Sequence, residues 1–201
     1  MATLLTDLSP ADMQLRLDDA LSVYVDAMRY PRGTERQRAS MWLEHTRREG
    51  WTGVAAFDVP TADEEPESAL RSAAMLGVAY GYRGAPDQWW YQQVATGLRH
   101  VGTPSERIGQ LMDGYFELTE LHIHPRAQGQ GLGSLLLVDA LWRAQHLAEQ
   151  VGIRAVEVDA VDEAQGAEEH PVQVEVRDEH EAHALARARV VVGELRQRPV
   201  Q

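Results

Sequence analysis

Apolar residues recur at two different spacings along the chain, and each spacing predicts one type of element. Between residues 10 and 30, and again between 34 and 49, apolar positions return at helical intervals. The first helix is expected to begin at Ser9-Pro10, an N-cap followed by a proline, and to end at Pro31 and Gly33. Gly50 is expected to end the second helix.

Segments rich in β-branched and aromatic residues predict the strands. These strands cover residues 2–6, 51–59, 75–82, 115–123 and 153–161. An acidic loop over 60–68 makes a hairpin of the second and third strands, residues 84–113 form an insertion with helical content, and an apolar helix covers 131–151. This order predicts an α/β fold with a mixed, largely antiparallel sheet flanked by helices.

The C-terminal quarter differs in composition from the rest. Residues 153–201 contain no Phe, Tyr, Trp, Ser, Thr or Met. Val172, Val174 and Val176 alternate as in a strand. Two explanations stay open: a divergent segment that still closes the sheet, or out-of-frame translation of GC-rich coding sequence. We therefore divide the chain into a domain at 1–161 and an atypical segment at 162–201, and expect weak packing from Asp162 onward.

Composition narrows the possible partners. The formal net charge of −12 argues against nucleic acid and anionic membranes, both of which require clustered basic residues. No apolar run approaches the roughly 20 residues of a membrane span, and the N-terminus shows no secretory signal, so the cytoplasm is expected. The chain has no cysteine, which excludes a cysteine nucleophile.

A glycine-rich turn joins the strand at 115–123 to the apolar helix. Residues 128–133 read Gln-Gly-Gln-Gly-Leu-Gly. The first amides of a helix have no partner within the helix and carry partial positive charge, and glycines let an anion approach them. Taken alone, the run is equally compatible with a ligand-free turn.

The sequence around this turn resembles the acyl-CoA signature of the GNAT superfamily of N-acetyltransferases. The resemblance lies in Ile123-His124-Pro125 followed by Gln128-Gly129-Gln130-Gly131-Leu132-Gly133, and the order of elements over residues 3–160 agrees with it. A Rossmann dinucleotide site is the main alternative, but that motif opens a βαβ unit and has an acidic residue about 20 residues later. Here the turn follows two helices and several strands, and residues 151–155 are apolar apart from Arg154.

The resemblance implies an acetyl-CoA site built on backbone groups. The turn would hold the pyrophosphate, and the end of the preceding strand would pair with the pantetheine arm where the strands at 115–123 and 153–161 splay apart. The implied cosubstrate-binding residues are Leu121, His122, Ile123, Gln128, Gly129, Gln130, Gly131, Leu132, Gly133 and Ser134. The implied activity is direct transfer of the acetyl group to an amine in a ternary complex. The alternative is an acyl-CoA-binding module without turnover.

Two carboxylates on the strand before the turn are candidates for the base. A separation of three residues places Glu117 and Glu120 on opposite faces of a regular strand, so at most one faces the acetyl group. Glu117 lies six residues before Ile123, where many GNAT enzymes carry a base glutamate, and Thr119 shares its face. Glu120 is then expected to point to a helix or to solvent.

The remaining polar and aromatic residues have simpler interpretations. His122 and His124 share the face of Glu120 and are weaker candidates for a base, and no third ligand suggests a metal site. The aromatic residues at 89–91 are expected to pack against the sheet rather than to cover an acceptor. The family's tyrosine that protonates the CoA thiolate has no match here, so no general acid is assigned. The sequence does not decide whether the acceptor amine belongs to a small molecule or to a peptide, or whether the protein forms a homodimer.

Overall fold

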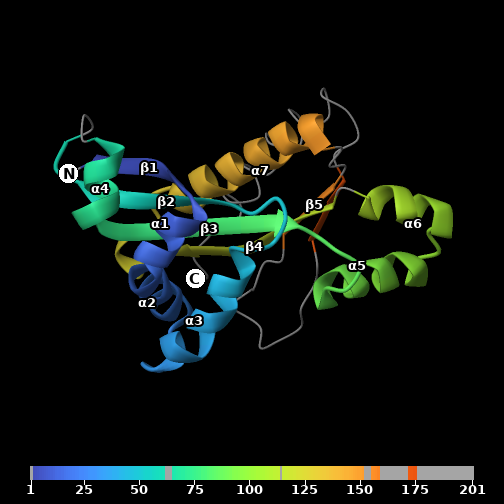
Figure 1. The fold of residues 1–201 in the computed structure, drawn as a ribbon, viewed down its shortest axis with the longest axis horizontal. Helices are drawn as coiled ribbons and strands as arrows, with labels where there is room; N and C mark the ends of the chain where they lie inside the picture. The colour runs from blue at the N-terminus through green and yellow to red at the C-terminus, as the bar shows by residue number, and fades with distance from the viewer. Residues whose placement is uncertain (1, 62–64, 114, 152–154, 159–171, 176–201) are drawn as a thin grey trace, which may run out of the picture.

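The computed structural model describes residues 2–61, 65–113, 115–151, 155–158 and 172–175. Figure 1 shows one sheet with helices on both faces. The strands are β1 (Ala2–Leu8), β2 (Thr52–Val59), β3 (Ala74–Arg83), β4 (Tyr115–Ile123), β5 (Ala155–Val158) and β6 (Val172–Glu175). The helices are α1 (Pro10–Leu15), α2 (Leu17–Met28), α3 (Thr34–His45), α4 (Pro66–Ser72), α5 (Trp89–His100), α6 (Ser105–Met112) and α7 (Leu132–Val151), with a short 3-10 turn η1 (Pro125–Ala127).

The sheet has the mixed, largely antiparallel topology that the sequence predicts. Its strand order is β1-β2-β3-β4-β5-β6; β1 to β4 are antiparallel, β5 is parallel to β4, and β6 is antiparallel to β5. Val172 and Val174 belong to β6, as their alternation predicts. The rest of 162–201 lies outside the described residues, so weak packing there stays a prediction.

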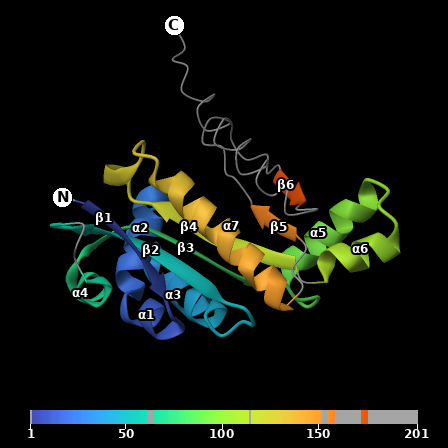
Figure 2. The same cartoon turned by 90° about the horizontal axis from the view of Figure 1, so that it is seen from above.

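Two apolar layers enclose the sheet (Figures 1 and 2). One joins α1, α2 and α3 to β1, β2 and β3, and the other joins α7 to β2, β3 and β4. Trp42 is fully buried in the first layer, where its ring meets the ring of Tyr80 edge-on. Leu136 is fully buried in the second. Since strand residues alternate between faces, β4 presents different chemistry to each layer.

The helix expected between residues 10 and 30 is divided in two at Arg16. Ser9 caps α1 in a reciprocal capping box with Asp12, as its sequence predicts. Arg16 is buried, and its guanidinium donates to the carbonyls of Leu70 and Ala73 (2.7 Å to the latter). These carbonyls lie at the end of α4, so a tertiary contact interrupts the helix.

The structure also corrects the expected loop at 60–68 and the expected end of the second helix, and it defines the insertion at 84–113. Residues 66–68, expected in a loop, begin α4 with a proline at its first turn, and α3 ends at His45 rather than at residue 49. The insertion contains α5 and α6, and the ring of Tyr91 packs edge-on against Tyr115 of β4. Trp89, by contrast, is 64% exposed.

No helix within the described ranges is both long enough and apolar enough to cross a membrane.

Candidate functional site: the bulged strand and the glycine turn

A β-bulge divides β4 at Thr119. Tyr80 of β3 lies opposite Glu120, whereas the next residue, Gly81, lies opposite Leu118, so Thr119 has no counterpart on β3. Gly81 permits this close approach, because a Cβ atom there would lie 2.3 Å from the Glu117 carbonyl oxygen. The extra residue shifts the alternation of side chains by one position.

The bulge places both carboxylates on one face of the sheet, which corrects the sequence expectation of opposite faces. Glu117 lies opposite Tyr82 and Glu120 opposite Tyr80, two β3 residues that share the α2–α3 side. Leu118 and Leu121, which a regular strand would also separate, both pack on the α7 side. The faces of these residues were assigned wrongly because the sequence contains no sign of the bulge.

Glu117 is buried and only half satisfied. The residue is 8% exposed, Oε1 accepts a 3.3 Å hydrogen bond from the Tyr82 hydroxyl, and Oε2 is buried with no hydrogen-bond partner among the described residues. Burial raises the pKa of Glu117 to about 7, against the lowering effects of the Tyr82 hydrogen bond and of Arg48. Burial also raises the pKa of Tyr82 to about 12, so its proton stays available to the carboxylate.

Glu120 has a very different environment on the same face. Its Oε2 lies 2.5 Å from Nε2 of His122, and both side chains are mostly buried. The His122 ring meets the ring of Tyr24 edge-on at 4.9 Å and stacks on Trp42 at 6.3 Å. Glu120 was expected on the face opposite Glu117, but it lies on the same face and pairs there with a histidine.

Within the described residues, the half of β4 after the bulge has one edge without a paired strand. The parallel pairing of β4 with β5 runs from Tyr115 to Leu118, opposite Ala155 to Val158, and within the described part of the chain it does not extend further. The residues that follow β5 lie outside the described ranges. The splayed strands that the GNAT resemblance implies, with residues 119–123 free to pair with an added extended chain, therefore stay a prediction.

The glycine turn follows this half of β4. Gly129 and Gly131 have φ of 74° and 79°, a left-handed conformation that favours glycine, and a Cβ atom on either would meet nothing within 4 Å. The side chain of Gln128 donates a 3.0 Å hydrogen bond to the Ile123 carbonyl, which holds the turn against the strand. Residues 128–131 are exposed, while Leu132 is buried at the start of α7. The turn thus presents bare backbone to solvent at a helix N-terminus.

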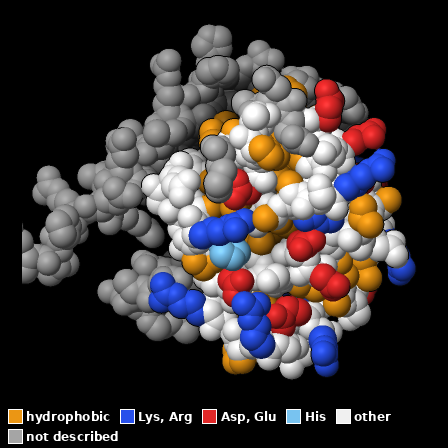
Figure 3. Space-filling view, turned by 90° about the vertical axis from the view of Figure 1, so that its left-hand side faces the viewer, with side chains coloured by type: hydrophobic (Ala, Val, Ile, Leu, Met, Phe, Trp, Pro, Cys, Tyr) orange, Lys and Arg blue, Asp and Glu red, His pale blue; other side chains and the backbone are white. Residues whose placement is uncertain are grey.

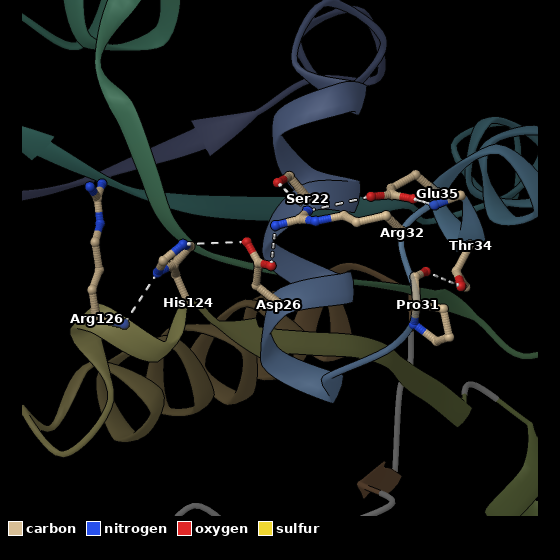
Figure 4. Close-up of polar contacts among 9 residues, drawn as sticks. Ser22, Asp26, Pro31, Arg32, Thr34, Glu35, His124 and Arg126 are labelled. Atoms are coloured by element: carbon tan, nitrogen blue, oxygen red, sulfur yellow. Dashed lines mark hydrogen bonds and ion pairs between the residues drawn. The ribbon is translucent and has the colours of Figure 1, made fainter.

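A chain of polar side chains connects the turn to α2 and to the loop after it (Figure 4). Nδ1 of His124 accepts from the backbone N–H of Arg126 at 3.2 Å, and Nε2 lies 3.5 Å from Oδ2 of Asp26. Asp26 in turn accepts a 2.6 Å hydrogen bond from Arg32, which also lies 3.5 Å from Glu35. Such pairs intersperse acidic and basic side chains over the end of the molecule seen in Figure 3. His124 thus links the start of the turn to α2.

Sequence reasoning missed three residues of this site. Tyr82 contacts Glu117, Gly81 admits the bulge, and Arg48 lies over the Tyr82 ring, 4.9 Å from its centroid. The signal for Gly81 and Tyr82 was a Gly-Tyr pair at the end of a predicted strand, but only the register reveals their partners. Within the described ranges, no three His, Asp or Glu side chains are grouped to hold a metal ion.

The comparisons with known proteins agree with this geometry. A GCN5-like protein acetyltransferase of Mycobacterium tuberculosis is 62% identical over 146 residues, covering 68% of this chain and 70% of the relative. No family model matches the chain. The chain therefore belongs to the GNAT family of N-acetyltransferases on the strength of that relative, as the signature at residues 123–133 predicts.

Solved structures show only distant similarity. The PaiA N-acetyltransferase of Thermoplasma acidophilum, solved with coenzyme A, has a TM-score of 0.47 and 13% identity, covering 88% of this chain and 100% of that one. A phosphinothricin acetyltransferase of Sinorhizobium meliloti, solved with acetyl-CoA, has a TM-score of 0.45 and 20% identity, covering 79% and 66%. These likenesses add nothing to the family assignment.

Proposed function

We propose that the protein transfers an acetyl group from acetyl-CoA directly to an amine, with Glu117 as the general base. The observation that carries this proposal is the buried Glu117 carboxylate, which has a pKa of about 7 and one oxygen without a partner among the described residues, two residues before the bulge at Thr119. A base works best when its pKa lies near the working pH, because it is then both deprotonated and strong enough to accept a proton.

Acetyl-CoA would bind along two features that adjoin each other. The amides of residues 128–134, at the start of α7, suit the pyrophosphate, and the glycines at 129 and 131 keep side chains away from it. The backbone edge of Leu121, His122 and Ile123 suits the pantetheine arm, which would pair there as an additional strand. The thioester would then lie beside the bulge.

The chemical step follows from these positions. The amine nitrogen attacks the thioester carbonyl carbon, a C–N bond forms, and the C–S bond breaks as the CoA thiolate leaves. Glu117, directly or through one water, takes the proton that the amine loses. The chain has no cysteine to carry the acetyl group, which favours direct transfer in a ternary complex. We also propose that the acceptor is a small molecule or a peptide, that the reaction takes place in the cytoplasm, and that the protein forms a homodimer.

Steady-state kinetics test the proposal. Release of free CoA thiol is measured with acetyl-CoA and a panel of small amines and lysine peptides, and the acetylated product is identified by mass. We expect amine-dependent thiol release with intersecting double-reciprocal lines. Parallel lines would contradict direct transfer. Tight acetyl-CoA binding without turnover of any amine would instead support the non-catalytic module.

A further inference from the structure

A cleft of about 680 Å³ lies beside the catalytic face. One wall is the turn after α3, with Arg47 and Arg48, and the other is the insertion, with Tyr91 and Met112; Arg83 of β3 lies between them. This volume falls within the range of small-ligand sites. The insertion thus builds half of a cleft next to the strand that carries Glu117.

The arginines of this cleft are not equally engaged. Arg83 lies 3.2 Å from Glu49 and 3.7 Å from Asp113, so two carboxylates balance its charge. Arg48 lies 3.8 Å from Glu44, an exposed side chain, and its Nε atom is buried with no hydrogen-bond partner among the described residues. The Glu44 contact is longer than a hydrogen bond, so the Nη groups of Arg48, rather than the buried Nε, can donate to a further acceptor in the cleft.

Arg48 is also near the proposed chemistry. Its guanidinium lies over the Tyr82 ring, and the hydroxyl of that tyrosine donates to Glu117. One tyrosine side chain therefore separates this cation from the base. A guanidinium is planar, and it pairs with a carboxylate through two parallel hydrogen bonds.

We propose that the cleft binds the part of the acceptor adjoining its amine, and that Arg48 pairs with a carboxylate there. The acceptor is then an amine that carries a nearby carboxylate, and Arg48 is a specificity-determining residue. The carboxylate has two sources, a free amino acid or an acidic side chain next to an acceptor lysine in a peptide. This inference rests on the proposed function, since it names the acceptor class for that site.

Two matched pairs of acceptors test the inference at saturating acetyl-CoA. The first is lysine against lysinamide, and the second is a capped Lys-Glu peptide against its Lys-Gln counterpart. In at least one pair we expect the carboxylate member to have a kcat/KM about ten-fold or more higher, mostly through KM. Arg48→Gln should bring that ratio close to one, and Arg48→Lys, which keeps the charge without the planar group, should give an intermediate ratio.

Arg71→Gln is the matched control, because Arg71 is 75% exposed on α4 and pairs there with Glu67. It should keep the wild-type ratio. Equal use of both members of each pair by the wild type, or a preference that survives in Arg48→Gln, would overturn the inference while leaving the proposed function intact. A wild type that acetylates other amines but none of these four would overturn the inference alone, whereas one that binds acetyl-CoA and acetylates no amine at all would contradict both.

Discussion

The two halves of β4 carry similar side chains in different surroundings. Before Thr119 the strand has a neighbour on each side, and Glu117 is buried with one oxygen that no described residue pairs with. After Thr119 the strand pairs with β3 only, as far as the structure describes the chain, and Glu120 pairs with His122 before the glycine turn. A bulge of one residue thus separates a half suited to proton transfer from a half suited to binding the cosubstrate.

The difference in pairing explains why Glu117 rather than Glu120 is the stronger base candidate. An unpaired, desolvated carboxylate favours its neutral form, which raises its pKa toward neutrality. Glu120, by contrast, already has a partner, because its Oε2 lies 2.5 Å from Nε2 of His122.

Removing the Glu117 carboxylate should have the largest effect. Glu117→Gln should lower the rate of acetyl transfer at about pH 7 by roughly 10²–10⁴, with little change in acetyl-CoA affinity. The matched variant Glu120→Gln should lower the rate by less than about ten-fold. Thiol-release assays with both variants measure this difference. Equal losses of rate in the two variants would contradict the assignment of proton transfer to Glu117 alone.

Blocking the turn should affect binding on the other half. Gly131→Glu should weaken acetyl-CoA binding by about 100-fold or more, because a carboxylate would enter the space proposed for the pyrophosphate and repel it. Gly102→Glu is the matched control, since Gly102 also has a positive φ (83°) and open surroundings but lies between α5 and α6. Calorimetry should show loss of binding in the first variant and near-normal binding in the second. If a folded Gly131→Glu variant kept its affinity for acetyl-CoA, the pyrophosphate would not bind at this turn.

Filling the space at the bulge should weaken the fold itself. A Cβ atom at Gly81 would meet the Glu117 carbonyl oxygen at 2.3 Å, so Gly81→Ala should lower the free energy of unfolding by about 1–3 kcal/mol. Gly97→Ala, where a Cβ atom meets nothing within 4 Å in helix α5, should be neutral or slightly stabilising. Urea unfolding of the two variants gives the comparison. A Gly81→Ala as stable as Gly97→Ala would argue against the bulge.

Features that depend on neighbouring residues in the sequence could be predicted, whereas features that depend on contacts between distant parts of the chain could not. The strands, the Ser9 cap and the glycine turn follow from local patterns, and all are present. The break at Arg16 and the bulge at Thr119 depend on contacts with residues far along the chain, which no local pattern reveals. The base candidate was therefore found by its offset from the turn, whereas its hydrogen-bond partner Tyr82 was not.

The raised pKa of Glu117 predicts a pH-dependent stability. Because the folded-state pKa is about 7 and the ordinary value is 4.5, the folded state binds the proton more tightly, so stability falls as pH rises from 4.5 through 7. Glu117→Gln removes this ionisation. The variant should match the wild type at about pH 4 and exceed it by about 1–3 kcal/mol at about pH 9. Urea unfolding at several pH values measures this, and a constant difference across pH would mean that the carboxylate is not desolvated.

The pH dependence of kcat/KM tests the role of Glu117 most directly. For the wild type we expect a rise with a midpoint near pH 7 as Glu117 ionises, followed by a further rise as the acceptor amine loses its proton. In Glu117→Gln the first rise should disappear and the second should remain, so that the two proteins converge at high pH. A variant that kept the rise near pH 7 would show that another group is the base.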